Sequence, residues 1–244
     1  MTAHPIPTSP SPRQNHLLAA LLAPEYERLL PDLEPVPMPL GSVLYESGGR
    51  LEHVYFPTTS VVSLLYVMKD GNSAEIAIAG NEGLVGIALI MGGQTTPSRA
   101  VVQCAGEAYR MKPAALKLEF DRGEAMQRLM LRYMQALVTQ MVQTAACNRH
   151  HSVEQQFCRW LLLSIDRLPT NEVSMTEGLI ANMLGLRQEG VTSIAQQLEN
   201  EGLIDYDGGR ITVLDRPGVE VRACECYSVV RKEFDRLLPN EMMV

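Results

Sequence analysis

Residues 176–201 read TEGLIANMLGLRQEGVTSIAQQLENE, and this stretch decides the fold of the C-terminal half. Counting from Glu177, the small residue Ala181 stands fifth, Gly185 ninth and Val191 fifteenth. A small side chain at Ala181 lets a second helix cross close to the first, and Gly185 permits the positive φ that ends the first helix. With apolar residues in the positions between, the spacing predicts a helix-turn-helix, whose second helix is free to enter a DNA major groove.

A β-hairpin is predicted directly after the second helix. Residues 202–215, GLIDYDGGRITVLD, read as strand, turn and strand, with the turn at 207–209. A hairpin in this position is typical of the wing of a winged helix-turn-helix. Arg210 at its tip and Arg216 at its end are therefore predicted to contact phosphates.

The exposed N-terminal part of the second helix carries the side chains that we expect to read DNA. Arginine can fork onto guanine, glutamine onto adenine, and glutamate accepts from cytosine N4. Val191 and Ile194 are expected to bury the opposite face. The alternative is a solvated helix face, with the acidic residue favoured only by the helix dipole. The predicted DNA-binding residues are Arg187, Gln188, Glu189, Thr192 and Ser193 of the helix, with Arg210 of the wing.

The overall charge argues against a protein that coats nucleic acid non-specifically. The chain of 244 residues has a net charge of −7 and a pI of about 5.3. From residue 152 onward, 9 Lys and Arg stand against 15 Asp and Glu. A DNA-binding module with this balance has weak affinity for DNA in general, so it depends on direct readout and on dimerisation.

The N-terminal half is predicted to be rich in β-structure. Residues 1–15 hold several prolines among Ser and Thr and are expected to be a disordered tail. Two short helices follow, and prolines at 35, 37 and 39 stop any helical continuation. Between about 40 and 112, short stretches rich in Val, Tyr and Ile alternate with Gly or Pro turns, which indicates a β-sandwich, jelly roll or barrel.

A long helix is predicted from Glu124 to about Asn148, where the sequence holds no Pro or Gly. Its apolar residues alternate at spacings of four and three, which is the pattern of a coiled-coil seam between two copies of the chain. The alternative is a single amphipathic helix that lies on its own domain. The predicted dimer interface consists of Met130, Met134, Leu137 and Met141.

A hinge is expected at 148–152, where Ser152 and Gln155 have the spacing of a capping box that opens a new helix. The adjacent histidines at 150–151 point apart on a helix, so a polar hinge is expected there rather than a haem or metal ligand. We therefore predict no metal site.

Five scattered cysteines, an odd number, indicate a reducing cytoplasm rather than a disulfide framework. Cys224 and Cys226 stand two apart on a predicted helix, about 200° around it, which does not suit chelation. No apolar run approaches the length of a membrane span, and the N-terminus does not read as a secretory signal. A cytoplasmic protein with no membrane association is expected.

A β-roll, a long helix, a hinge and a winged helix-turn-helix, in this order, resemble the Crp/Fnr family of bacterial transcription regulators over about residues 17–230. The most specific stretch is LGLRQEGVTSIAQQLENEGLI, residues 184–204. Glu189 matches a glutamate typical of the family's recognition helix, whereas Gln188 and Ser193 stand where many members have arginine. A different operator is therefore expected.

The resemblance implies an α+β fold in four parts: a tail at 1–15, a jelly-roll sensor domain of the cyclic-nucleotide-binding type at 16–122, a dimerisation helix with hinge at 123–151, and a winged helix-turn-helix at 152–239. It also implies a regulator rather than an enzyme, which binds double-stranded DNA as a homodimer. RNA polymerase is a further expected partner.

The expected effector pocket departs from the cyclic-nucleotide branch of the family. That branch holds ribose and phosphate with a Gly-Glu-Leu segment and a later Arg-Ser pair. Here Gly86 matches, but Ile87 takes the glutamate position and Ala100 follows Arg99. This speaks against cyclic AMP and leaves another nucleotide, such as cyclic di-GMP, open. The candidate pocket residues are Gly86, Arg99 and Met141, and no cofactor is predicted.

Two other functions fit parts of the pattern. The first is a cyclic-nucleotide-binding-like signalling module that acts through protein contacts rather than DNA, which the acidic C-terminal half favours. The second is an enzyme with a β-barrel catalytic domain, which the lack of a nucleophile–base–acid set in the sequence disfavours.

Overall fold

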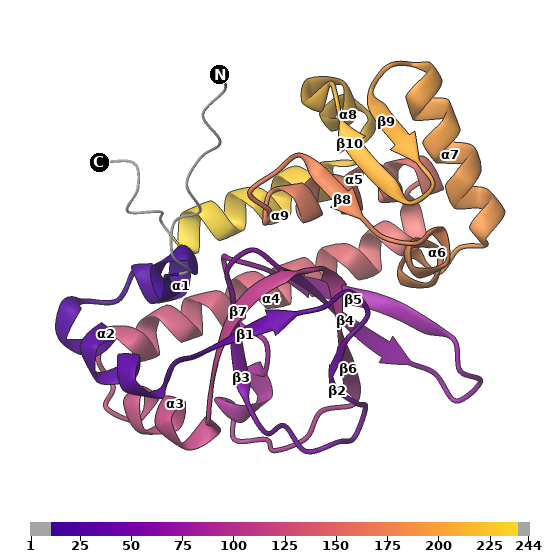
Figure 1. The fold of residues 1–244 in the computed structure, drawn as a ribbon. Helices are drawn as coiled ribbons and strands as arrows, with labels where there is room; N and C mark the ends of the chain where they lie inside the picture. Colours follow the sequence, from indigo (N-terminus) through magenta and orange to yellow (C-terminus); the bar gives the residue numbers. More distant parts are fainter. Residues whose placement is uncertain (1–10, 239–244) are drawn as a thin grey trace.

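Two β-sheets form the N-terminal half of the protein, and one long helix lies along them (Figure 1). The structure is a computed structural model, and it describes residues 11–238. The N-terminal half also holds three short helices, α1 (His16–Ala19), α2 (Ala23–Leu29) and α3 (Pro113–Phe120). One sheet has the order β1 (Glu34–Met38), β7 (Gly106–Met111), β3 (Val54–Pro57), and the other the order β2 (Val43–Tyr45), β6 (Ser98–Cys104), β4 (Val61–Val67), β5 (Ser73–Ala79). The predicted β-roll is confirmed.

The strand β1 was not expected, because its sequence EPVPM contains two prolines. Pro35 and Pro37 have no N–H, so in a central strand each would remove a hydrogen bond from the sheet. β1 avoids this cost by lying at the edge of its sheet, where it pairs only with β7. Proline is tolerated at such an edge.

The prediction of a disordered tail over residues 1–15 is wrong for its last part. Residues 11–15 form a short 3₁₀ turn, and the side chain of Asn15 is fully buried. Its amide donates to the carbonyl oxygens of Pro57 (2.9 Å) and Gly83 (2.8 Å), so it ties the chain entry to the β-roll. Residues 1–10 lie outside the described part of the chain.

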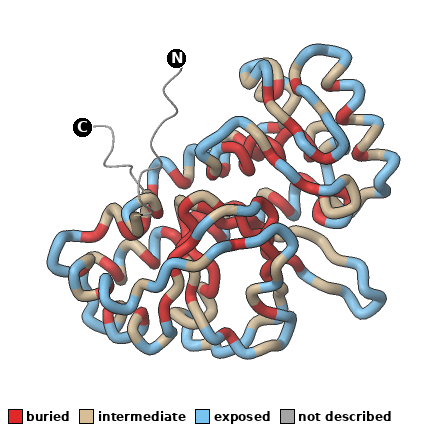
Figure 2. The backbone as a smooth tube through the Cα atoms, in the orientation of Figure 1, coloured by how far each residue is buried: buried red, intermediate tan, exposed pale blue. Residues whose placement is uncertain are grey.

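The long helix α4 (Ala125–His150) buries one side within its own chain (Figure 2). The β-roll and the C-terminal helix α9 (Glu225–Leu237) both pack on this inner side. Met130 and Leu137 are 0% and 3% exposed and belong to the main core, so they cannot form the predicted dimer seam. Met134 and Met141 are half-buried.

The apolar residues on the outer side of α4 stand one position after those of the predicted seam. Leu131, Val138 and Val142 expose more than half of their surface, at 51%, 58% and 59%. With Met134, Met141 and Ala145 they form an apolar strip, which we call the outer face of α4. Sequence periodicity located an apolar stripe but could not tell which of two neighbouring stripes the β-roll and α9 would cover.

The C-terminal half holds five helices and a small sheet. α5 (Val153–Ile165) begins at the predicted capping box, because Ser152 accepts from Gln155 N (3.2 Å) and Gln155 Oε1 accepts from Ser152 N (3.0 Å). The remaining elements are β8 (Glu172–Ser174), α6 (Glu177–Leu184), α7 (Gln188–Asn200), β9 (Ile204–Asp207), β10 (Arg210–Val213), α8 (Arg216–Arg222) and α9. The sheet order is β8, β10, β9, so the predicted hairpin gains a third strand.

An apolar contact holds this half against α4, and we call it the apolar joint. α9 runs along α4, and the ring of Phe234 meets that of Tyr133 edge-on at 6.4 Å between centroids. Both side chains are buried, and Tyr133 donates to Leu84 O (2.9 Å) inside the β-roll. Because this joint buries aromatic surface, its strength comes from the hydrophobic effect and close packing.

A second contact connects α5 to the β-roll through polar side chains, and we call it the polar joint. Arg167, just after α5, donates to Glu82 Oε1 (2.7 Å) of the β-roll. Gln103 on β6 donates to Ser63 Oγ (2.9 Å) and accepts from Trp160 Nε1 (3.1 Å), while Ser63 donates to Glu75. This network crosses from the β-roll into the C-terminal half.

No helix in residues 11–238 is both long enough and apolar enough to cross a membrane.

Candidate DNA-binding site

The turn between α6 and α7 has the geometry that its sequence predicts. Gly185 ends α6 in the left-handed region at φ 65°, where a side chain would be strained. Thr176 caps the start of α6, since its hydroxyl accepts from Leu179 N (3.3 Å). Ala181 is buried, as a close helix crossing requires. The predicted helix-turn-helix is confirmed.

The second helix, α7, has a buried face and an open one. Val191, Ala195 and Leu198 are each 0% exposed and pack into the core, while Ile194 is half-buried. Arg187 occupies the N-cap position of α7 and its side chain makes no capping hydrogen bond, so it lies at the end of the helix that would enter a groove. Among the predicted contact residues of this helix, Thr192 is half-buried and the exposed ones are Arg187, Gln188, Glu189 and Ser193.

One carboxylate connects both helices and the wing. Glu177, the first residue of α6, accepts from Gln188 Nε2 (3.0 Å), from Thr192 Oγ1 (3.0 Å) and from the hydroxyl of Tyr206 on β9. The hydrogen bond from Tyr206 is the largest cause that holds the pKa of Glu177 below its usual range, and burial raises the pKa of Tyr206. The residue was missed, although a first-turn Glu followed by a tyrosine in the wing is visible in the sequence.

The hydrogen bonds to Glu177 give Gln188 and Thr192 a structural role besides the predicted DNA contact. Both are bound by Glu177 in the free protein, so part of their hydrogen-bonding capacity serves the orientation of α7. Arg187, Glu189 and Ser193 remain the more open part of the predicted reading surface.

Of the two arginines of the wing that are predicted to contact phosphates, one is exposed at the surface. Arg210 begins β10 next to the Gly208–Gly209 turn and is exposed. Its guanidinium lies 3.3 Å from Asp207 Oδ2, with both side chains more than half exposed. A pair this exposed is weak and can be exchanged for a phosphate at little cost.

Arg216 is different, because internal partners hold its guanidinium, and its phosphate contact stays a prediction. It lies at the start of α8 and pairs with Asp166 and with Glu220 Oε1 (3.0 Å), and it donates to Tyr227 Oη (2.7 Å). Asp166 directly follows α5, Glu220 lies on α8 and Tyr227 on α9, so this guanidinium joins the end of α5 to α8 and α9. The sequence offered no signal for this, because Asp166 lies 50 residues away.

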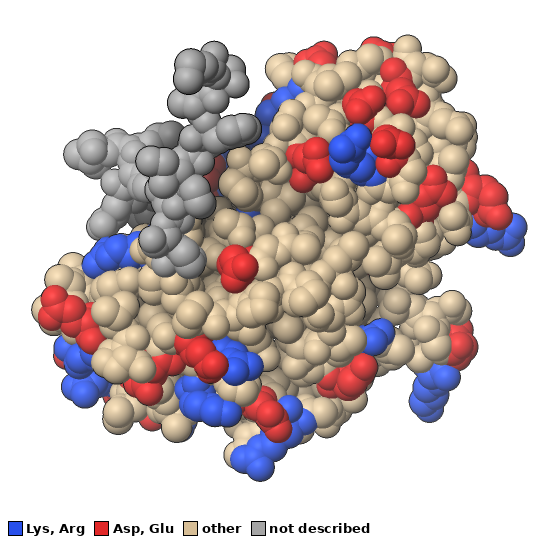
Figure 3. Space-filling view, in the orientation of Figure 1, with Lys and Arg blue, Asp and Glu red and all other residues tan. Residues whose placement is uncertain are grey.

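Most cations of this half take part in similar internal pairs. Arg222 pairs with Glu154 and Glu201, and Arg236 with Glu233, while Arg159 and Arg167 are buried. On the face seen in Figure 3, acidic side chains gather over α7 and the wing, and basic ones are few there. The acidic balance predicted from composition therefore extends to the surface next to α7.

The three predicted effector-pocket residues are spread over separate elements. Gly86 precedes the short 3₁₀ turn at Ile87–Leu89 and has φ 106°, so backbone conformation alone explains this glycine. Arg99 on β6 pairs with Glu46 at 3.0 Å, and a phosphate would compete with that carboxylate. Met141 lies half-buried on α4.

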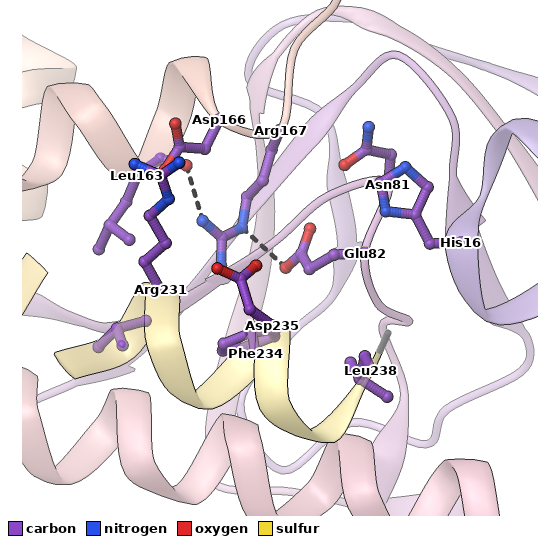
Figure 4. Close-up of a pocket in the computed structure, with 11 residues that line it drawn as sticks. His16, Asn81, Glu82, Leu163, Asp166, Arg167, Arg231, Phe234, Asp235 and Leu238 are labelled. Atoms are coloured by element: carbon purple, nitrogen blue, oxygen red, sulfur yellow. Dashed lines mark hydrogen bonds and ion pairs between the residues drawn. The ribbon is translucent and has the colours of Figure 1, made fainter. Parts of the chain in front are cut away.

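A cavity of about 210 Å³ lies between the two halves of the chain, beside the polar joint (Figure 4). His16, Glu82 and Arg167 line it, with Arg231 and Asp235 from α9. Charges of both signs face it, and burial lowers the pKa of His16. None of the predicted pocket residues lines this cavity.

The helical placement of Cys224 and Cys226 on which the prediction of no chelation depended is wrong. That prediction assumed that both lie within a helix, but Cys224 is the residue before α9, with extended backbone at φ −78° and ψ 164°. The two sulfurs therefore do not follow the helical spacing. The structure brings them together with Cys147 and His151 at the hinge.

Comparison with known proteins identifies the C-terminal half. Residues 155–221 match the Crp-like helix-turn-helix domain. No curated protein matches the sequence.

Solved structures with the same fold cover most of the chain. FixK2 from Bradyrhizobium japonicum is 16% identical, with a TM-score of 0.68 over 79% of this chain and 98% of its own. A CRP-family transcriptional regulator from Thermus thermophilus is 18% identical, with a TM-score of 0.62 over 77% and 96%. The c-di-GMP-responsive regulator CLP from Xanthomonas campestris is 15% identical, with a TM-score of 0.60 over 79% and 99%.

These likenesses agree with the order of elements described above, from β-roll through α4 to the winged domain. Residues 155–221 thus match a Crp-like helix-turn-helix domain, and the chain as a whole has the fold of solved Crp/Fnr-type structures.

Proposed function

We propose that this protein is a homodimeric, sequence-specific transcription regulator that reads DNA through the N-terminal part of α7. The observation that carries the proposal is the open face of α7. Arg187, Glu189 and Ser193 are exposed on it, while the opposite face is fully buried. The Glu177 contacts support this function because they fix α7 relative to α6 and the wing before any DNA is bound.

A second copy of the chain supplies the partner that the outer face of α4 lacks. Leu131, Val138 and Ala145 recur every seven residues, and Met134 and Met141 lie three residues after the first two of these. This is the spacing of a two-stranded helical seam. Two copies packed in this way carry two α7 helices, which suits an operator with two half-sites about one DNA turn apart.

The β-roll is assigned the role of sensor. A signal received there would act through the polar joint and α4, and so change the relative placement of the two recognition helices. With Arg99 held by Glu46 and hydrophobic or small residues at 87 and 100, cyclic AMP would leave polar groups unpaired. The cytoplasm, with RNA polymerase as a partner at the promoter, is the place where such a regulator acts.

Selection of bound DNA from a random pool tests the function, followed by competition assays on the selected operator. Glu189→Ala is expected to relax the preference at one base pair per half-site, by about 1–3 kcal/mol. Arg210→Ala should instead weaken binding to all DNA sequences alike. It should also lower the slope of log affinity against log salt concentration by about one, as loss of a phosphate contact does. If no DNA sequence is enriched from the pool, or if Glu189→Ala leaves the preference at every operator position unchanged, α7 is not the reader and the alternative of a module that acts through protein contacts is favoured.

Sedimentation tests the dimer. Val138→Glu would put like charges opposite each other in the seam and is expected to give monomers. Leu118→Glu is the matched control, because Leu118 is 65% exposed on α3, away from this face. A dimeric Val138→Glu variant would exclude the outer face of α4 as the interface.

A further inference from the structure

Four metal-ligating side chains meet where α4 ends and α9 begins. Cys147 lies in the last turn of α4, and His151 is the residue that follows the helix. Cys224 precedes α9, and Cys226 lies in its first turn. Their three sulfurs and one imidazole nitrogen all lie within 4.8 Å of one another. The hinge between the halves runs directly past this group, at Ser152.

The spacing of these atoms suits a single tetrahedral ion. The sulfurs of Cys147 and Cys224 are 3.5 Å apart, and Cys226 Sγ lies 3.6 Å from Nδ1 of His151. Zinc bonds of about 2.3 Å to sulfur and 2.0 Å to nitrogen place tetrahedral ligand atoms about 3.5–3.8 Å from one another. Two of the six distances are thus within about 0.3 Å of the tetrahedral value, and the others, none longer than 4.8 Å, need to close by little more than about 1 Å.

The histidine is oriented as a metal ligand is. Its Nδ1 faces the sulfurs, and its Nε2 lies 3.3 Å from Glu225 Oε1. A carboxylate at the second nitrogen fixes the tautomer and presents the other nitrogen to a metal, which is the usual support for a ligating histidine. Its neighbour His150 is exposed and takes no part.

The surroundings also balance the charge that such a site would carry. A divalent ion with three thiolates and a neutral histidine has a net charge of −1. Arg159 is 4% exposed and interacts electrostatically with Cys147 and Cys226. Within residues 11–238 its Nε finds no hydrogen-bond partner, so this buried cation lacks a full set of protein contacts of its own.

The five cysteines fall into two environments. Cys104 and Cys158 are buried in the main core, and burial raises the pKa of each thiol to about 12. The other three form a small buried cluster of their own, apart from that core. These three cysteines do not fill the main core as Cys104 and Cys158 do. Binding of a metal ion would explain why they lie together.

We propose that Cys147, His151, Cys224 and Cys226 form a tetrahedral site for one zinc-class divalent ion, which ties the end of α4 to the start of α9. Three thiolates and an imidazole select zinc over magnesium or calcium, which prefer oxygen. Four protein ligands leave no open position, so the ion has a structural role. In an iron–sulfur cluster the four protein ligands are shared among two or more iron atoms, so all four would not lie this close to one another.

Metal analysis of the full-length protein, purified without chelator under reducing conditions, tests the site. About one zinc per chain is expected. Metal-free protein titrated with Co²⁺ should give the visible d–d bands of a tetrahedral ion and a near-ultraviolet thiolate-to-cobalt band. Cys226→Ser and His151→Ala should lose these bands, whereas Cys104→Ser and His150→Ala should keep them. Glu225→Gln should weaken metal affinity about 10–100-fold without abolishing it.

Three results would overturn the proposal: no zinc together with no thiolate-to-cobalt band in the wild-type protein, iron with acid-labile sulfide in place of zinc, or zinc retained by both ligand variants. The Co²⁺ titration of the wild type does not depend on the folding of any variant. Since none of these measurements uses DNA, their outcome is separate from that of the operator selection.

Discussion

The apolar joint and the polar joint connect the same two halves of the molecule by opposite chemistry. At the apolar joint, Phe234 of α9 packs on Tyr133 of α4. This contact is buried, and its strength depends little on the exact orientation of the groups. At the polar joint, Glu82 and Arg167 form a buried ion pair, and Glu75 takes part through Ser63. The apolar joint is expected to hold under all conditions, whereas the polar joint depends on every partner and on the charge of its carboxylates.

The largest effect is expected at the apolar joint. Phe234 is 8% exposed, and Arg167 lies over its ring at 5.3 Å, so Phe234→Ala opens a cavity and removes support from the second joint as well. The free energy of unfolding should fall by about 3–5 kcal/mol in urea titrations. Leu118→Ala, at an exposed site, should change it by less than about 0.5 kcal/mol. A loss below 1 kcal/mol for Phe234→Ala would mean that α9 is not firmly docked.

A somewhat smaller loss is expected when the ion pair of the polar joint is broken. The side chains of Glu82 and Arg167 are 14% and 5% exposed, so Glu82→Gln leaves a buried guanidinium without its counter-charge. The expected cost is about 3 kcal/mol. Adding Arg167→Met to Glu82→Gln should restore much of this stability, because it removes the uncompensated charge. A double variant that is less stable than the single one would show that the pair contributes more than charge balance.

A pH-dependent effect separates the two joints most sharply. Burial raises the pKa of Glu75 to about 7, above its value in the unfolded chain of about 4.5. The folded state therefore favours the protonated carboxyl. Below pH 4.5 the carboxyl is protonated in both states and does not lower the free energy of unfolding. That free energy falls as the pH rises from 4.5 through 7. Glu75→Gln should be more stable than wild type by about 1–3 kcal/mol at pH 8 and similar at pH 4.5.

The measurement is urea unfolding of both proteins at the two pH values. Phe234→Ala serves as the comparison, because its loss of stability should hardly vary between them. An equal difference between Glu75→Gln and wild type at pH 4.5 and pH 8 would contradict the raised pKa of Glu75.

The smallest effect concerns the exposed edge of the apolar joint. Gln135 on α4 donates to Glu233 Oε1 of α9 (3.1 Å), and this hydrogen bond is exposed to water. Gln135→Ala should change the free energy of unfolding by less than about 0.5 kcal/mol in the same urea assay. A larger loss would indicate that polar contacts, and not Phe234, position α9.

Features governed by local chemistry could be predicted from the sequence. Gly185 ends α6 because a left-handed residue is needed within that turn, and Ser152 with Gln155 opens α5 through contacts only three residues apart. The hairpin at 204–213 likewise depends on two adjacent glycines. In each case the deciding partners lie within one turn of chain, where residue type and spacing are informative.

Features that depend on distant partners could not be predicted. The side of α4 that is buried depends on where the β-roll and α9 pack, so Leu137 was assigned to the wrong face. Cys147 and Cys224 are 77 residues apart, and only the return of α9 along α4 brings them together. The proline-rich β1 is stable because it lies at a sheet edge, and its sequence alone does not show that position.

The internal pairing of cations in the C-terminal half bears on how the proposed regulator would find its operator. With Arg216 and Arg222 engaged by carboxylates of the same half of the chain, few positive charges remain to follow the DNA backbone. Proteins that slide along DNA depend on such charges, so a surface of this kind favours arrival at each operator from free solution. Encounters with unrelated DNA would then be brief. The time to locate a promoter would depend mainly on the number of protein copies in the cell and little on the length of the surrounding chromosome.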